Sequence, residues 1–173
     1  DYVAAVGLAV RHLVAQGCSR LAFLSVTART SAREERLSGF ARALAETGIT
    51  NAGVVEADLT WEGAAQSAAQ ILALGTRPDA VLCFNDVLAA GLMAGLRRAG
   101  CEPGRDIAVV GLDDLPLAEL THPALTSVAM DAPRIGRNAA GLLARRLADP
   151  AAVPQRDIVA PRLVVRDSSF QKV

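Results

Sequence analysis

Short apolar runs alternate with amphipathic segments along most of this chain, and this alternation limits the fold more than any other feature of the sequence. The apolar runs occupy residues 21–26, 54–57, 80–84 and 107–111. The amphipathic segments, whose apolar residues recur at helical spacing, occupy residues 3–16, 34–47, 62–74 and 86–99. One unit takes about 25 to 30 residues, which is the rhythm of βαβ folds. Because the expected strands are continuously apolar, we predict a doubly wound α/β fold, a parallel sheet with helices on both faces.

The carboxy-terminal third departs from this rhythm. A shorter strand is expected at 126–129, followed by a helix from about Pro133 to Ala148. Extended pieces at 157–160 and 163–166 are expected to close the chain.

Composition and charge limit the class of protein. The 173 residues are 51% hydrophobic and 21% charged, which is typical of one ordered globular domain with a substantial core. The 18 basic residues balance 18 acidic residues, so the chain offers no field that attracts a polyanion such as DNA.

The amino terminus has neither a basic leader nor an apolar stretch of spanning length, so we expect no membrane contact. Because a helix pattern begins at once, we also expect a fragment whose upstream part is absent.

Metal, cofactor and catalytic signatures are sparse. Cys18, Cys83 and Cys101 share no metal-ligand spacing and lie in or beside apolar runs, which favours buried thiols in a reducing cytoplasm. The two histidines, His12 and His122, are expected to be structural. No Gly-x-Ser-x-Gly elbow is present, and no phosphate-binding glycine loop follows the first expected strand. We therefore predict a protein that is not an enzyme and uses no cofactor.

Polar side chains gather where the expected strands end. In open parallel sheets, ligands bind at the carboxyl ends of the strands, because loops and helix amino termini converge there. The candidate ligand-binding residues at these ends are Arg36, Trp61, Asn85 and Asp113. Arginine, asparagine and aspartate match the donors and acceptors of adjacent hydroxyls, and an indole can cover the apolar face of a sugar ring. The combination resembles a sugar site more than a catalytic one.

Each candidate also has a simpler interpretation. Asn85 or Asp86 could serve simply as the cap of the helix that follows. The adjacent Asp113 and Asp114 could simply form a turn. Trp61 could pack at the sheet edge. Arg36, finally, could be a solvated helix residue.

Four ordered sequence blocks resemble the lactose/galactose-repressor family of transcription regulators. The most distinctive is Asn85-Asp86 at a strand-to-helix junction, within residues 78–91. Three further blocks follow in the family order, at 106–116, 123–128 and 163–169. With the Arg-Leu-x-Gly-aromatic block at 36–40, the resemblance runs from Asp1 to about Ser169.

The resemblance implies a periplasmic-binding-protein-like (type I) fold, of which this chain is the carboxy-terminal subdomain. Arg36, Asn85 and Asp113 are expected to contact a small-molecule effector, and Trp61 lies at a position that is often aromatic. A sugar is the family's commonest effector class, while purines and other small metabolites are bound on the same scaffold. The implied division is an effector-binding subdomain at 1–130, a crossover segment at 131–160 that packs with an absent amino-terminal subdomain, and a strand and tail at 161–173.

The resemblance further implies a cytoplasmic repressor whose effector closes a cleft between two subdomains and so alters operator binding. Operator DNA is then contacted only by a headpiece absent from this chain. The intact protein is expected to be a homodimer, joined partly through the helix containing Met93 and the loop 115–120. The apolar face of the helix near 133–149 is expected to lack its usual partner. Two alternatives stay open: a sugar-binding protein of a transport system, and an α/β enzyme that uses Asp58 or Asp86.

Overall fold

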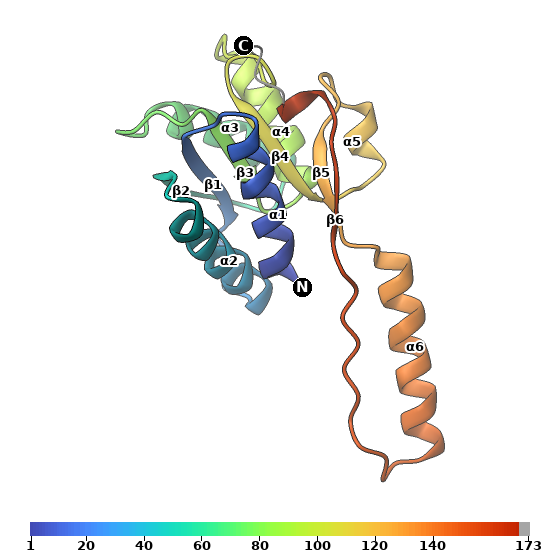
Figure 1. Cartoon of the computed structure of the whole chain (residues 1–173). Helices are drawn as coiled ribbons and strands as arrows, with labels where there is room; N and C mark the ends of the chain where they lie inside the picture. The colour runs from blue at the N-terminus through green and yellow to red at the C-terminus, as the bar shows by residue number, and fades with distance from the viewer. Residues whose placement is uncertain (170–173) are drawn as a thin grey trace.

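A computed structural model describes residues 1–169 and shows a six-stranded sheet with helices on both faces (Figure 1). The strand order is β2-β1-β3-β4-β5-β6, in which the first five strands are parallel and β6 is antiparallel to β5. The strands are β1 (Arg20–Val26), β2 (Thr50–Ala57), β3 (Ala80–Cys83), β4 (Ala108–Asp113), β5 (Thr126–Ala129) and β6 (Arg162–Val164). The helices are α1 (Tyr2–Ala15), α2 (Ser31–Thr47), α3 (Trp61–Leu72), α4 (Asp86–Arg98), α5 (Leu117–Leu120) and α6 (Ala132–Ala148). The predicted doubly wound α/β fold is confirmed; residues 170–173, the end of the expected tail at 161–173, lie outside the described residues.

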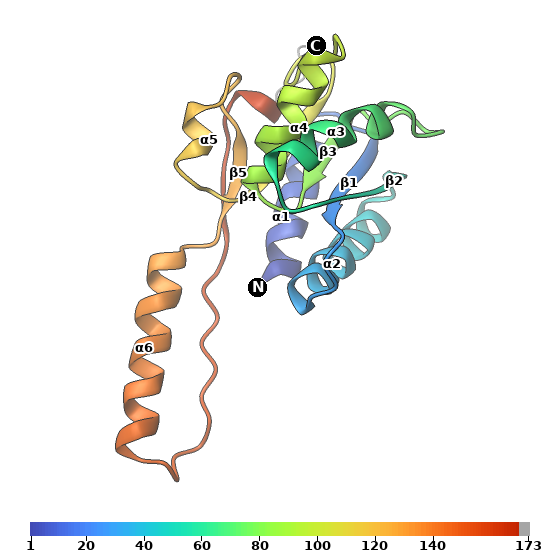
Figure 2. The ribbon, with the colours of Figure 1, turned by 180° about the vertical axis from the view of Figure 1, so that it is seen from behind.

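Two helical layers cover the sheet. α1 and α2 pack together on one face, and α3 and α4 pack together on the other (Figure 1 and Figure 2). The central strands β3 and β4 are buried almost throughout, and β1 is buried from Leu21 onward. The edge strand β2 is only partly buried. The continuous apolar runs of the sequence therefore correspond to the strands that helices cover on both sides.

Helix caps place three helix amino termini at the carboxyl edge of the sheet. Thr30, Thr60 and Asn85 each have an extended backbone, and each side-chain oxygen accepts a hydrogen bond from the amide three residues later. Such caps satisfy amides that have no partner within the helix. Because α2, α3 and α4 directly follow β1, β2 and β3, their first turns lie beside the strand ends.

Two boundaries differ clearly from the sequence-based expectation. β2 begins at Thr50 rather than near Val54, because its first residues pair with β1. The expected extended piece at 157–160 is not a strand: it runs beside α6, where no other segment of residues 1–169 offers it a hydrogen-bond ladder (Figure 1). The final strand, β6, is short and is formed only where the chain reaches β5.

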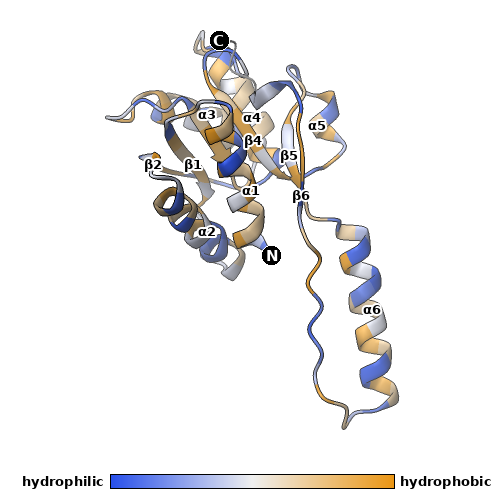
Figure 3. Ribbon diagram, in the orientation of Figure 1, coloured by the Kyte–Doolittle hydropathy of each residue, from blue (hydrophilic) through white to orange (hydrophobic). Residues whose placement is uncertain are grey.

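α6 projects from the sheet as an arm, and the segment after it runs back alongside (Figure 1). Hydrophobic and hydrophilic residues both occur along this helix (Figure 3), and none of its residues is buried. Ile135, Leu143 and Leu147 are all exposed, so the apolar face that we expected to be without its partner is open. No helix among residues 1–169, α6 included, is long and apolar enough to cross a membrane.

The packing of α3 on α4 generates a stability prediction. A Cβ atom at Gly95 would lie 2.2 Å from the backbone oxygen of Ala65, so Gly95→Ala forces the two helices apart. We expect this substitution to lower the free energy of unfolding by about 3 kcal/mol or more. Gly141→Ala in α6 is the matched control, because a Cβ there meets open space and alanine stabilises a helix by up to about 1 kcal/mol over glycine. Urea unfolding measures both, and similar midpoints for the two variants would contradict the close helix contact.

Candidate functional site

Polar residues from four adjacent strands meet at the carboxyl edge of the sheet. Asp58, Thr27 and Asn85 follow the ends of β2, β1 and β3, and Asp113 is the last residue of β4. The Thr27 hydroxyl donates a hydrogen bond to Asp58 Oδ1 over 3.0 Å, which joins two neighbouring strand ends. Parallel pairing thus brings together polar groups that lie far apart in the sequence.

Arg36 reaches this edge from the second turn of α2. Its side chain is only 3% exposed, and its guanidinium lies between two aromatic rings, with Cζ 3.6 Å from the centroid of Tyr2 and 4.1 Å from that of Phe84. Nη1 donates to the carbonyl oxygen of Ala32 at 3.0 Å, and Nη2 lies 3.9 Å from Asp113 Oδ1. The interpretation of Arg36 as a solvated helix residue is therefore wrong.

Arg36 and Asp113 together present unused hydrogen-bonding capacity. The Arg36 Nε is buried and has no hydrogen-bond partner among the described residues, a costly state unless a ligand or water completes it. The 3.9 Å between Nη2 and Asp113 Oδ1 is too long for a direct hydrogen bond. Burial raises the pKa of Asp113, and the nearby Arg36 opposes that rise. A ligand hydroxyl between the two side chains could accept from the guanidinium and donate to the carboxylate.

The adjacent aspartates at the end of β4 point to different partners. Both have positive φ angles, 104° at Asp113 and 52° at Asp114, which residues other than glycine rarely adopt. Asp114 Oδ1 accepts a hydrogen bond from Arg166 Nη1 at 2.8 Å, whereas Asp113 faces Arg36. The turn-forming interpretation is thus correct for the backbone, and the turn also directs Asp113 toward the candidate site. The pairing of Asp114 with Arg166 was not predicted, because the two residues lie in separate sequence blocks.

Asp86 is fully buried beneath this turn. Its Oδ2 accepts a hydrogen bond from the Leu115 amide at 2.7 Å, and its Oδ1 accepts one from the Ser127 hydroxyl at 2.5 Å. Burial raises the pKa of Asp86 to about 6; these two hydrogen bonds oppose the rise, while the charges of Asp113 and Asp114 add to it. A buried carboxylate with both oxygens engaged cannot contact a substrate, which removes Asp86 from the catalytic alternative.

Asn85 is a helix cap, as its simpler interpretation held. Its Oδ1 accepts a hydrogen bond from the Leu88 amide at 3.0 Å, and the residue is half-buried. The cap uses the side-chain oxygen and leaves the amide nitrogen free to donate. A ligand contact by Asn85 therefore remains a prediction that concerns its Nδ2.

Trp61 lies apart from the other three candidates. It is exposed and lines a surface hollow of about 300 Å³ together with other α3 residues and Arg98 of α4. No described contact joins it to Arg36 or Asp113. The exposed apolar residue nearest the end of β2 is instead Leu59. The sequence indicates that Trp61 follows a strand, but only the packing of α3 on α4 decides where its side chain points.

Two aromatic residues that complete the site were not candidates from the sequence. Phe84 directly precedes Asn85 at the end of β3, and this position beside a predicted site residue was a usable signal. Tyr2 gave no such signal, because it belongs to a helix that precedes the first strand. Only the packing of α1 against α2 places its ring over Arg36.

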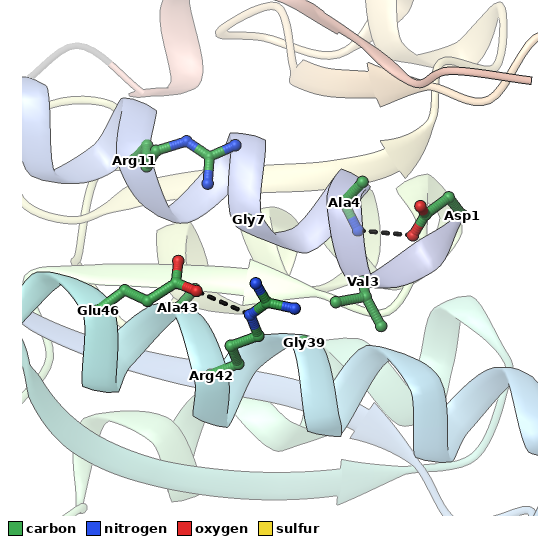
Figure 4. Close-up of a pocket in the computed structure, with 9 residues that line it drawn as sticks. All are labelled: Asp1, Val3, Ala4, Gly7, Arg11, Gly39, Arg42, Ala43 and Glu46. Carbon is green, nitrogen blue, oxygen red and sulfur yellow. Dashed lines mark hydrogen bonds and ion pairs between the residues drawn. The ribbon is translucent and has the colours of Figure 1, made fainter.

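A cavity of about 490 Å³ lies between α1 and α2 (Figure 4). None of the four candidate residues lines it, and Gly7 and Gly39 are among those that do. A Cβ atom at Gly39 would lie 3.0 Å from the Val3 Cα, so glycine at this position permits the close approach of the two helices. Arg42 at the border is already engaged, since its Nε donates to Glu46 at 2.7 Å. We attribute this cavity to helix packing and not to effector binding.

The thiols and His12 have structural surroundings. All three cysteines are free and buried, as expected. Burial raises the pKa of Cys18 to about 12 and also raises that of Cys83, so these thiols are unreactive. His12 Nε2 lies 2.8 Å from the Ser169 hydroxyl oxygen. The part of the chain that the structure describes contains no group of three or more side chains that could hold a metal ion.

Comparisons with known proteins show the family and the fold of this chain. Residues 10–169 match the family described as the periplasmic binding protein-like domain. The chain is 37% identical over 163 residues to the HTH-type transcriptional repressor PurR of Vibrio vulnificus, a match that covers 93% of this chain and 49% of the relative. The chain thus spans about half the length of the curated relatives that it matches.

Solved structures extend the similarity to the whole described fold. The Lac repressor dimer bound to operator and the anti-inducer ONPF superposes with a TM-score of 0.91 at 29% identity, over 98% of this chain and 51% of that chain. A LacI family transcriptional regulator from Arthrobacter sp. FB24, in complex with lactose, gives a TM-score of 0.84 at 32% identity, over 98% of this chain and 64% of that chain. Both structures belong to regulators of the kind that the sequence blocks resemble.

The raised pKa of Asp86 predicts a specific pH dependence of stability. Unfolding returns this carboxyl from a pKa of about 6 toward its ordinary 3.8, so the folded state binds the proton more tightly. The resulting contribution to stability is complete below about pH 4 and is lost as the pH rises to about 6. Over that interval we expect the free energy of unfolding of the wild type to fall by on the order of 2 kcal/mol more than that of Asp86→Asn.

Urea unfolding at pH 4, 5, 6 and 7 provides this measurement. Asp113 and Asp114, whose charges act on Asp86 from β4 and the turn, are present in both proteins, so the difference between the two profiles reports on the Asp86 carboxyl. Parallel profiles would show that the Asp86 carboxyl is not perturbed.

Proposed function

This chain belongs to the lactose/galactose-repressor family of transcription regulators, and we propose that it forms the part of a repressor that senses a small-molecule effector. The observation that carries the proposal is the pairing of Arg36 with Asp113 at the carboxyl ends of the parallel strands. The Arg36 Nε is buried without a hydrogen-bond partner among the described residues, and the Asp113 carboxylate beside this side chain is partly exposed. A ligand that hydrogen-bonds to both side chains would satisfy them. This is the location at which open α/β sheets bind small molecules.

A sugar or a related metabolite is the proposed effector. The guanidinium and the carboxylate are 3.9 Å apart, which suits two neighbouring groups of one ring, such as adjacent hydroxyls. The Arthrobacter relative is in complex with lactose, which supports this class. A nucleobase is the second candidate, because its ring edge also alternates donors and acceptors.

The proposed mechanism is allosteric closure of a cleft. Arg36 and Asp113 form one wall, and we assign the opposite wall to another part of the intact protein, because this chain spans about half of its relatives. The exposed apolar face of α6 is suited to pack against that part. An effector that binds the closed form more tightly shifts the population toward it, and operator DNA reciprocally changes the effector affinity.

Operator DNA is assigned to a headpiece outside these 173 residues. The basic and acidic residues of this chain cancel to a net charge of zero, which offers the phosphate backbone no electrostatic footprint. The Lac repressor relative is a dimer bound to operator, which supports the same arrangement here.

A protein with this role acts in the cytoplasm. The three buried free thiols suit that reducing compartment and disfavour the alternative of a secreted sugar-binding protein.

The first test substitutes the two residues that define the site. In the intact protein, we expect Arg36→Ala and Asp113→Asn to weaken effector binding about tenfold or more, because each leaves a ligand group or a buried partner without its hydrogen bond. Operator binding without effector is expected to stay unchanged. Fluorescence anisotropy of labelled promoter DNA, with and without lactose, ribose, adenine or guanine, measures both quantities.

Arg42→Ala is the matched control for this test. Arg42 lies on the same helix, is exposed, and among residues 1–169 its side chain pairs only with Glu46, so its loss should leave the effector response intact. An undiminished response in Arg36→Ala and Asp113→Asn would refute the site. Absence of DNA binding together with saturable sugar binding would instead support a transport protein.

We also propose that the intact protein is a homodimer joined through α4 and the loop 115–120. Residues 117–120 of this segment form the short helix α5 and not a loop. Leu120 at its end is 84% exposed, and Leu115 before it is also exposed. Met93, in contrast, is fully buried within the chain. The expectation that the helix containing Met93 contributes to the interface therefore concerns other α4 residues and not Met93 itself.

Leu120→Glu tests the dimer. A charge placed in an apolar contact is expected to raise the dimer dissociation constant of the intact protein by about tenfold or more, measured by sedimentation equilibrium. Val54→Glu is the control, because Val54 is an exposed apolar residue on the edge strand β2, which lies at the other end of the sheet from β5 and β6. An unchanged dimer in Leu120→Glu, or equal weakening in Val54→Glu, would remove the assignment.

A further inference from the structure

We propose that Asp86 is a positioning residue for the effector site: its buried carboxylate holds the turn after β4 in the conformation that directs Asp113 toward Arg36. The inference rests on the proposed function, in which Asp113 contacts the effector. Asp86 itself is fully buried and acts on the site only through the backbone of the turn.

Hydrogen bonds connect Asp86 to two consecutive amides of this turn. Asp86 Oδ2 accepts directly from the Leu115 amide at 2.7 Å. Its Oδ1 accepts from the Ser127 hydroxyl at 2.5 Å, and the same hydroxyl oxygen accepts from the Asp114 amide at 3.0 Å. The amides that immediately follow Asp113 are therefore both anchored to one carboxylate at the start of α4.

The adjoining strand leaves room for this carboxylate. A Cβ atom at Gly111 would lie 2.2 Å from Asp86 Oδ1, so any side chain there would displace the carboxylate. Gly111 is paired with Ser127 in the ladder between β4 and β5, which places the Ser127 hydroxyl beside the same space. The first residue of α4 is thus packed directly against the backbone of β4.

The carboxylate of Asp86 serves the turn and not its own helix. Asn85 caps α4 through the Leu88 amide, and both described hydrogen bonds of the Asp86 side chain go to Leu115 and Ser127 instead. A first-turn acid that only favoured the helix dipole could stay in solvent. Its complete burial is explained by the partners that it holds outside α4.

The turn needs such an anchor because its backbone is strained. The φ of 52° at Asp114 lies in the left-handed region that aspartate tolerates, whereas the φ of 104° at Asp113 lies outside it and persists only where the surroundings hold it. The side chain of Asp114 is held by Arg166 at 2.8 Å. Among the described residues, no hydrogen bond holds the side chain of Asp113, so its direction toward Arg36 depends on the anchored backbone.

The test compares Asp86→Ala with Asp86→Asn in the intact protein. The probe is whichever of lactose, ribose, adenine and guanine shifts operator binding of the wild type. Alanine removes both acceptors, and we expect the affinity for that probe to fall about tenfold or more. Asparagine can still accept from the Leu115 amide and hydrogen-bond Ser127, so we expect its affinity to stay within about threefold of the wild type.

Asp106→Ala controls for general loss of stability. Asp106 Oδ2 also anchors a turn, by accepting from the Glu102 amide at 2.7 Å, but this turn lies at the opposite end of β4. Its loss should leave probe affinity within about twofold of the wild type. Equal losses in Asp86→Ala and Asp86→Asn, or in Asp86→Ala and Asp106→Ala, would overturn the positioning role. If Asp86→Ala does not fold, Ser127→Ala removes the link to Asp114 and is expected to weaken binding about threefold or more.

A crystal structure of the Asp86→Ala protein, or of Ser127→Ala in its place, tests the positioning role without any effector. We expect Asp113 to leave its positive φ and to move beyond its present 3.9 Å from Arg36. An unchanged turn would overturn the proposal whatever the probes do. If the turn moves while no probe shifts wild-type operator binding, the proposed function fails and the role of Asp86 in the turn stands.

Discussion

Parallel pairing of five strands fixes the positions of the helices and of the candidate site in this fold. Because the strands run in one direction, their carboxyl ends share one edge, and each following helix begins there. The caps at Thr30, Thr60 and Asn85 fix those helix starts. The candidate site is a consequence of this geometry, since it draws Arg36 from the helix after β1 and Asp113 from the end of β4.

Buried charge on both sides of the β4 end sets the properties of the site. The Arg36 guanidinium contacts the rings of Tyr2 and Phe84, and Asp86 is held by Ser127 and a backbone amide. Buried ionisable groups are a costly way to gain stability, and perturbed carboxyls cluster at functional sites. In the arrangement that we propose, these groups keep the Asp113 carboxylate directed toward Arg36.

The α6 arm indicates how this domain is used. This 17-residue helix has no buried residue, and exposed apolar side chains such as Leu143 and Leu147 are typical of a surface that packs against another. The length of the relatives, about twice the span matched here, is consistent with a second subdomain that supplies that surface. The proposed cleft wall and the exposed apolar face of α6 would both be explained by such a second subdomain.

Local sequence patterns were sufficient to predict the order of strands and helices, the parallel sheet and the strand ends at which polar residues collect. Apolar runs, helical spacing and caps depend only on residues that are close together in the chain. Local pattern was not enough at 157–160, where a strand-like run has no neighbour with which to pair. The packing of distant segments was needed to show that Tyr2 covers Arg36, that Trp61 lines a hollow beside Arg98, and that Asp86 bonds to the turn after β4. Each of these features depends on how a helix packs against a segment that is distant in the sequence. The residues next to a side chain in the sequence do not reveal where such packing places it.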